Sequence, residues 1–408
     1  MLDRILYRLA TGDWGRFRFL PGPGPENGLQ TALGIYVHIP FCRRLCSFCP
    51  YTRVLYTPDA AERYREALSR EAASLAIRPG LAVSSVYFGG GTPATVPAAV
   101  SRLLQLLRPC LTESPALAIE LHPRDATTEG LEWLLEQGIN MVSLGVESLQ
   151  ERALHWLGRD YGPAEALAAT EAALAAGLAT VNIDLITGLP GQTAEQAGRD
   201  MDRLLSLGVD QVSAYPFMEF PFTNAVSHYS LLRQWHTLNA LADTAAARAY
   251  ERTSVWTWTH PGKVPYTSIT RQRYIGLGVG AASCLDGCFR VNTFDLAAYC
   301  DAVLSGRSPA ALHTRLTAAE AALYRLFWAC YEGRIDPADP AWASLPYFHR
   351  RLVAARRLGL VTPDGGGVTF TRRGFFLYHL LERYYTSRYI AGLWQAGRRA
   401  AFPGELEL

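Results

Sequence analysis

The chain has 408 residues, of which 49% are hydrophobic and 19% are charged, and its formal net charge is +2. These values are typical of a folded enzyme with one large and one smaller domain, and the low net charge gives no overall attraction to nucleic acid or membranes. The sequence predicts neither a signal peptide nor a membrane-spanning run, so we expect a cytoplasmic protein whose eight cysteines stay reduced.

The first predicted segment is an irregular N-terminal leader over residues 1–33, a candidate lid, which closely spaced prolines separate from the rest. Six β-rich runs then alternate with amphipathic helices. We expect strands at 35–39, 83–88, 117–121, 141–146, 181–186 and 211–215, and helices at 60–76, 98–107, 131–137, 164–175 and 194–207. Such alternation is typical of parallel strands joined by right-handed crossovers, with ligands at the carboxyl ends of the strands. The pattern predicts an α/β fold, a partial (β/α)6 barrel with an extension over residues 34–305.

A different pattern occupies residues 306–408. Helices are expected at 316–332 and 349–358, followed by a glycine-rich turn at 365–367 and a strand at 368–371. This order predicts a small, mostly helical, winged-helix-like domain. Its arginines could bind nucleic acid, form a solvated surface or help to cover the barrel mouth. A basic surface alone is weak evidence, so we do not expect nucleic-acid binding.

The strongest chemical signal is three cysteines, Cys42, Cys46 and Cys49, within eight residues directly after the first predicted strand. Cysteine thiolates are the usual ligands of iron–sulfur clusters, and three of them leave one iron of a [4Fe–4S] cluster open. Structural zinc requires four ligands, whereas a catalytic zinc with an open position is the remaining alternative. The spacing favours the cluster.

Polar or glycine-rich residues end four of the six predicted strands. The backbone at 89–91 can approach a ligand closely and offer N–H groups to a carboxylate, and Glu120 can accept from an amino group or a ribose hydroxyl. Arg159 and Asp184 are expected to project from neighbouring units as a charged, hydrogen-bonding pair. Each feature alone is more typical of a turn, a solvated charge or a structural ion pair. Together they favour one shared site.

The C-x3-C-x2-C spacing at this position resembles the radical S-adenosylmethionine superfamily. Further motifs at 36–49, 89–93, 143–148, 157–159, 184–193 and 276–283 resemble its oxygen-independent coproporphyrinogen III oxidase-like family, including the class C methyltransferase branch. The resemblance implies a [4Fe–4S] cluster and two molecules of S-adenosylmethionine. It places Tyr36, Gly90, Glu120, Met218 and Ala282 around the first molecule, and Phe48, Gly91, Thr92, Glu147, Arg159 and Asp184 around the second. At Glu147 the family usually has glutamine.

The resemblance further implies reductive cleavage of S-adenosylmethionine, with an electron donor such as flavodoxin or ferredoxin, a small-molecule substrate and a monomeric enzyme. Tyr51 stands where the true oxidases have a further cysteine, and residues 266–271 lack the His-Asn-x-x-Tyr-Trp stretch of the haem chaperones. We therefore rank first the transfer of a methyl or methylene group from a second S-adenosylmethionine to an sp2 carbon of an aromatic or heteroaromatic substrate. Oxidative decarboxylation of a tetrapyrrole and non-catalytic haem trafficking are the alternatives. The sequence assigns no residue a catalytic role beyond the cofactor.

Overall fold

The computed structural model describes residues 17–25, 32–78, 80–223, 225–267 and 273–408. Its centre is a curved sheet in which six parallel strands lie side by side in chain order. These strands are β2 (Leu33–Ile39), β5 (Val83–Gly90), β6 (Leu111–Leu121), β7 (Met141–Glu147), β8 (Thr180–Thr187) and β9 (Gln211–Pro216). The predicted partial (β/α)6 barrel is confirmed.

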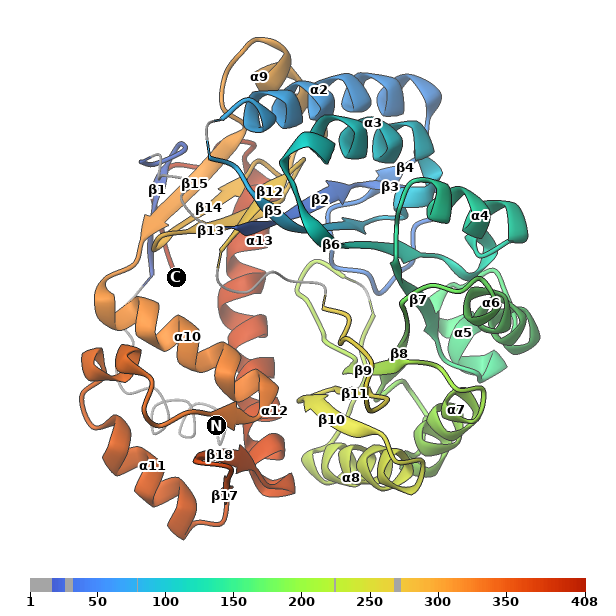
Figure 1. Cartoon of the computed structure of the whole chain (residues 1–408), viewed down its shortest axis with the longest axis vertical. Coiled ribbons are helices and arrows are strands. Elements are labelled where there is room, and N and C mark those ends of the chain that lie inside the picture. Colours follow the sequence, from blue (N-terminus) through green and yellow to red (C-terminus); the bar gives the residue numbers. More distant parts are fainter. Residues whose placement is uncertain (1–16, 26–31, 79, 224, 268–272) are drawn as a thin grey trace.

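Helices cover the outer, convex side of the curved sheet (Figure 1). They are α2 (Pro58–Ala76), α3 (Pro97–Leu107), α4 (Thr128–Glu136), α5 (Glu151–Leu157), α6 (Pro163–Ala175), α7 (Ala194–Ser206), α8 (Leu231–Ala247) and α9 (Leu296–Leu304). Three of them begin with a proline at the first helical position. Proline has no backbone N–H, and an N–H at this position would have no acceptor within the helix. No helix in the described part of the chain is long and apolar enough to cross a membrane.

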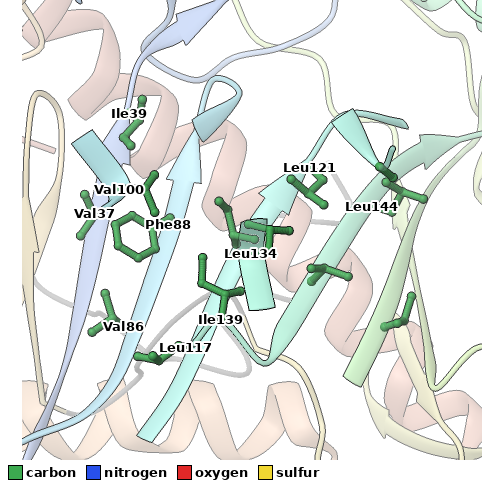
Figure 2. Packing of buried hydrophobic residues seen from close by; sticks show 14 of the residues in the cluster. Val37, Ile39, Val86, Phe88, Val100, Leu117, Leu121, Leu134, Ile139 and Leu144 are labelled. Atoms are coloured by element: carbon green, nitrogen blue, oxygen red, sulfur yellow. The ribbon is translucent and has the colours of Figure 1, made fainter. Parts of the chain in front are cut away.

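Alternation along the strands gives the sheet two different faces. Val37 and Ile39 of β2 and Val86 and Phe88 of β5 are buried in one cluster with Val100 of α3 (Figure 2). Burial of each such side chain contributes roughly 1.5–3 kcal/mol, so the covering helices are fixed on the convex side. The intervening positions face the concave side, and they carry Tyr36 and His38 on β2 and Tyr87 on β5. The corresponding polar positions are Glu120 on β6 and Asn182 and Asp184 on β8.

The sheet continues beyond the six predicted strands to fourteen among the described residues. The added strands are β10 (Glu251–Ser254), β11 (Thr257–Thr259), β12 (Tyr274–Leu277), β13 (Ala282–Leu285), β14 (Cys288–Asn292), β15 (Ala310–Arg315), β1 (Arg18–Pro21) and β19 (Leu406–Glu407). The prediction of an irregular leader is wrong for residues 18–21, because β1 pairs with β15 and β19 and satisfies their backbone groups. Residues 1–16 and 26–31 of the predicted leader lie outside the described residues.

The C-terminal part contains the predicted winged-helix arrangement. Its elements are α10 (Ala318–Glu332), β16 (Arg334–Ile335), α11 (Phe348–Arg357), β17 (Val361–Asp364) and β18 (Gly367–Phe370), and the three strands form one small sheet. Two further helices, α12 (Arg372–Tyr385) and α13 (Ala391–Arg399), were not predicted, and a π-helical turn joins them. They return the chain to the barrel, where Trp256 Nε1 donates to His379 Nδ1 of α12 at 3.0 Å. The division at residue 305 stays a prediction, since β15 and β19 belong to the main sheet.

Candidate cluster and cofactor site

The three predicted ligand cysteines lie on one loop at the carboxyl end of β2. Cys42 ends β3 (Phe41–Cys42), which pairs with β4 (Val54–Leu55), so the chain between them forms a closed loop that contains Cys46 and Cys49. Cys42 is buried and the other two are partly exposed; all three are free thiols. Burial raises the pKa of Cys42 and raises that of Cys49 to about 12. In the absence of metal these two thiols therefore stay protonated at neutral pH.

Within the described residues, no group of three or more His, Cys, Asp or Glu side chains is gathered closely enough to hold a single metal ion. A [4Fe–4S] cluster makes a different demand, because each thiolate binds a separate iron at a corner of the cube. Three thiols on one loop fit that demand.

Three consecutive glycines, Gly89, Gly90 and Gly91, form a glycine corner at the end of β5, and this corner lies against the cysteine loop. The backbone N–H groups of Gly91 and Thr92 donate to the carbonyls of Ile39 and Phe41, both at 2.8 Å. A Cβ at Gly91 would lie 2.6 Å from Phe41 O and 3.0 Å from Cys42 Sγ, so only glycine allows this close approach. Thr92 Oγ1 lies 3.9 Å from Cys42 Sγ. The predicted residues Gly91 and Thr92 thus directly contact the cysteine loop.

Tyr36 and Glu120 occupy the concave face next to this corner. Glu120 accepts from Tyr87 OH at 2.8 Å and from the backbone N–H of Gly90 at 3.1 Å, while the rings of Tyr36 and Tyr87 stack at 6.0 Å. Burial raises the pKa of Glu120 and these two donors oppose the rise. Tyr87, which sequence reasoning missed, therefore orients Glu120.

His38, for which no functional role was predicted, links Tyr36 to the cysteine loop. Burial lowers the pKa of His38 to about 4, so its imidazole is neutral. Its Nε2 lies 2.7 Å from Thr52 O and must carry the hydrogen, because a carbonyl only accepts. Its Nδ1 consequently accepts from Tyr36 OH at 3.0 Å. The neutral imidazole fixes both Tyr36 and the loop after Cys49.

Glu147 and Arg159 form a buried ion pair in which their side chains are 12% and 10% exposed. The Arg159 guanidinium also lies 5.6 Å from the Phe48 ring centroid. Burial raises the pKa of Glu147, against the opposing effect of Arg159. The expected pairing of Arg159 with Asp184 is wrong, because Glu147 at the end of β7 provides the closer carboxylate. Arg159 Nε is buried without a hydrogen-bond partner among the described residues, which leaves one donor for a ligand.

The backbone of Glu147 is left-handed, with φ of 66°, a conformation that costs a residue with a side chain roughly 1–2 kcal/mol. Asp200 of α7 holds the turn that follows. It accepts from Ser148 Oγ at 2.8 Å, from Leu149 N at 3.0 Å and from Gln150 Nε2 at 3.2 Å. These bonds stabilise a strained position that faces the site, and no sequence motif indicated them.

Asp184 lies on the neighbouring strand and is held by Ser143 Oγ at 2.6 Å and Asn182 Nδ2 at 2.9 Å. Burial is the largest cause that raises its pKa to about 7; the two donors oppose the rise, and Glu147 and Glu120 add to it. Ser143 and Asn182 were missed as site residues, although polar side chains at inward positions of buried strands were a usable signal. The carboxyl group of Asp184 therefore gains or loses its proton near neutral pH and does not carry a permanent negative charge.

Met218 follows β9, and Ala282 begins β13. Met218 packs beside Trp256 in an apolar cluster that joins the barrel to α12, and Ala282 packs with Phe19 and Leu393 near β1 and α13. Their predicted contact with S-adenosylmethionine stays a prediction. The remaining predicted residues converge at the carboxyl ends of β2, β5, β6, β7 and β8.

Residues 36–204 match the radical SAM superfamily. The chain is 30% identical over 273 residues to the heme chaperone HemW of Lactococcus lactis, covering 64% of this chain and 71% of that protein. It is 29% identical over 297 residues to the oxygen-independent coproporphyrinogen III oxidase of Escherichia coli, covering 66% of this chain and 65% of that protein. The structure of coproporphyrinogen III oxidase (HemN) from E. coli has a TM-score of 0.77 at 23% identity over 93% of this chain and 98% of that chain, which shows the same fold.

Proposed function

The chain belongs to the radical SAM superfamily and, within it, to the family of the heme chaperone HemW and oxygen-independent coproporphyrinogen III oxidase, and from this premise we propose that it cleaves S-adenosylmethionine reductively at a [4Fe–4S] cluster. The observation that carries the proposal is the loop with Cys42, Cys46 and Cys49. It packs against Gly91 so closely that any side chain at that position would clash with the loop. When bound and reduced, such a cluster supplies one electron that breaks a carbon–sulfur bond of S-adenosylmethionine, giving methionine and a 5′-deoxyadenosyl radical.

The protein's own contribution is to bind and orient. Glu120, fixed by Tyr87 and Gly90, presents a carboxyl oxygen to an amino or hydroxyl group of the first S-adenosylmethionine. We propose Tyr36, Gly90, Met218 and Ala282 as its other contacts. Phe48, Gly91, Thr92, Glu147, Arg159 and Asp184 are proposed to contact a second molecule. The unpartnered Arg159 Nε supports this, because a buried N–H without an acceptor costs about 1–3 kcal/mol until a ligand supplies one.

For the reaction class, we propose first the transfer of a methyl or methylene group to an sp2 carbon of an aromatic or heteroaromatic substrate. The aromatic side chains of the concave face support an aromatic substrate. The rings of Tyr36 and Tyr87 stack at 6.0 Å, and the ring of Tyr266 lies 5.4 Å from that of Tyr87, which offers aromatic surface to such a substrate.

Oxidative decarboxylation of a tetrapyrrole is the second candidate, and haem trafficking is the third. The specific observation in their favour is the identity of the relatives, which are named as a coproporphyrinogen oxidase and heme chaperones. An electron donor such as flavodoxin or ferredoxin, a monomeric state and a cytoplasmic location complete the proposal. The leader and the C-terminal part are proposed as lids.

Anaerobic reconstitution with S-adenosylmethionine labelled in its methyl group tests the proposal. We expect 5′-deoxyadenosine together with S-adenosylhomocysteine and a labelled product. Carbon dioxide release from a porphyrinogen, with no label in any product, would refute methyl transfer and support the second candidate, oxidative decarboxylation. Tight haem binding without deoxyadenosine would support the third.

A further inference from the structure

The last helix of the chain contacts the cysteine loop. Arg398 of α13 donates through Nη2 to Pro50 O at 2.8 Å and to Tyr51 O at 3.4 Å. The ring of Trp394, one turn earlier on the same helix, lies 5.7 Å from the ring of Tyr51. Pro50 and Tyr51 directly follow the third predicted ligand, Cys49. A helix some 350 residues away in the chain therefore holds the backbone next to that cysteine.

Three contacts hold α13 in this place. Gly397 lies so close to Phe294 that a Cβ there would be 2.2 Å from the Phe294 ring, so only glycine allows the helix to reach the barrel. On the other side, the ring of Trp394 stacks on Phe220 at 5.6 Å, and the Arg398 guanidinium lies 4.5 Å from the Phe222 ring centroid. The aromatic contacts restrict the side chains that touch the loop, which lowers the entropy cost of holding it.

A second arginine holds the loop from inside. Arg53 donates through Nη2 to Cys46 O at 2.5 Å and through Nη1 to Tyr51 O at 3.4 Å. Tyr51 O thus receives a donor from Arg53 and a donor from Arg398. Tyr51 lies two residues after Cys49, so both guanidiniums contact a residue close in the chain to the third predicted ligand. Two fixed positive charges consequently lie beside the site of the third ligand.

We propose that Arg398 and Trp394 are positioning residues for the cluster, through which α13 holds residues 49–53 in the ligand-binding conformation. The Arg398 charge also favours the reduced cluster, because reduction adds a negative charge beside it. This inference rests on the proposed function, since it assumes a cluster at Cys49. It assigns the C-terminal part a role in cluster assembly and reduction, beyond that of a lid.

Amide hydrogen exchange of the full-length, cluster-free protein tests the positioning. The Val54 and Tyr56 amides, which donate to Pro40 O and Cys42 O, close this loop. Loss of a charge-assisted hydrogen bond at an exposed site should speed exchange of these two amides about threefold to tenfold in Arg398→Gln. Trp394→Ala should speed the same amides. Arg399→Gln is the matched control, because Arg399 is the exposed neighbour on the same helix. Exchange at the wild-type rate in both Arg398→Gln and Trp394→Ala, with circular dichroism unchanged, overturns the proposal.

The midpoint potential of the reconstituted cluster, followed by electron paramagnetic resonance, tests the charge. Arg398→Gln should make the potential more negative. Arg398→Lys should restore the wild-type potential, because lysine keeps the positive charge although it lacks the guanidinium that donates to both Pro50 O and Tyr51 O. Arg399→Gln should match wild type. A potential that is the same in Arg398→Gln and wild type overturns the electrostatic part. If the wild-type protein assembles no [4Fe–4S] cluster at all, the proposed function fails, whereas faster exchange in the variants would still show the loop contact.

Discussion

The replacement Asp184→Asn should remove a pH dependence from the stability of the cluster-free protein. The pKa of Asp184 rises from an ordinary 3.8 to about 7, first because of burial, while Ser143 and Asn182 oppose the rise. Between these values the folded protein binds a proton that the unfolded chain releases. The contribution of this proton to stability is therefore complete below pH 4 and is lost as the pH rises through about 7. The difference corresponds to ~4 kcal/mol of unfolding free energy, at about 1.4 kcal/mol per pH unit.

Urea denaturation of both proteins at a series of pH values from 4 to 8 measures this effect. Asparagine has the shape of a protonated aspartate and does not titrate, so the variant should lose less stability across the series and exceed wild type at pH 8. Asp202→Asn is the control. The pKa of Asp202 is lowered, first by its hydrogen bond from Arg248, so its small contribution is present at high pH and lost as the pH falls. If Asp184→Asn and wild type show parallel stability profiles, Asp184 does not carry the proton and the reasoning is wrong.

Three further predictions concern the same site. Glu147→Ala should lower the unfolding free energy by ~3–5 kcal/mol in urea denaturation, because it leaves Arg159 buried and unpaired; a loss under 1 kcal/mol would contradict the ion pair. Gly91→Ala should reduce the yield of cluster per protein on reconstitution, because the new Cβ would meet the backbone before Cys42, whereas Gly404→Ala has open space and should match wild type. Replacement of any one predicted ligand cysteine by alanine should abolish the iron–sulfur absorbance, whereas Cys284→Ala should retain it; the reverse pattern would refute the assignment.

Much of the barrel could be predicted because its signals are local. Alternating strands and helices identified β2, β5, β6, β7, β8 and β9, and the C-x3-C-x2-C spacing lies on one continuous loop. Convergence of glycine and carboxylate residues at the strand ends also followed from topology, since parallel strands bring their carboxyl ends to one rim. The order of helices and strands after residue 317 likewise indicated the small winged unit.

The long-range contacts could not be predicted in this way. Which carboxylate pairs with Arg159 depends on how far each strand extends, and the left-handed turn at Glu147 brings its side chain closer than that of Asp184. The neutral state of His38 and the near-neutral pKa of Asp184 follow from burial, which is a property of the assembled sheet.

The sequence by itself determined the fold class and the position of the cysteine loop, because each depends on neighbours along the chain. Only the tertiary structure decided that β1 and β19 complete the main sheet and that Arg398 contacts the cysteine loop. The physical reason is the same in both cases. Two segments that lie hundreds of residues apart in the chain can be joined by a backbone hydrogen bond or a side-chain contact. Such a contact leaves no periodic pattern in either segment. Which segments meet depends on how the intervening chain packs.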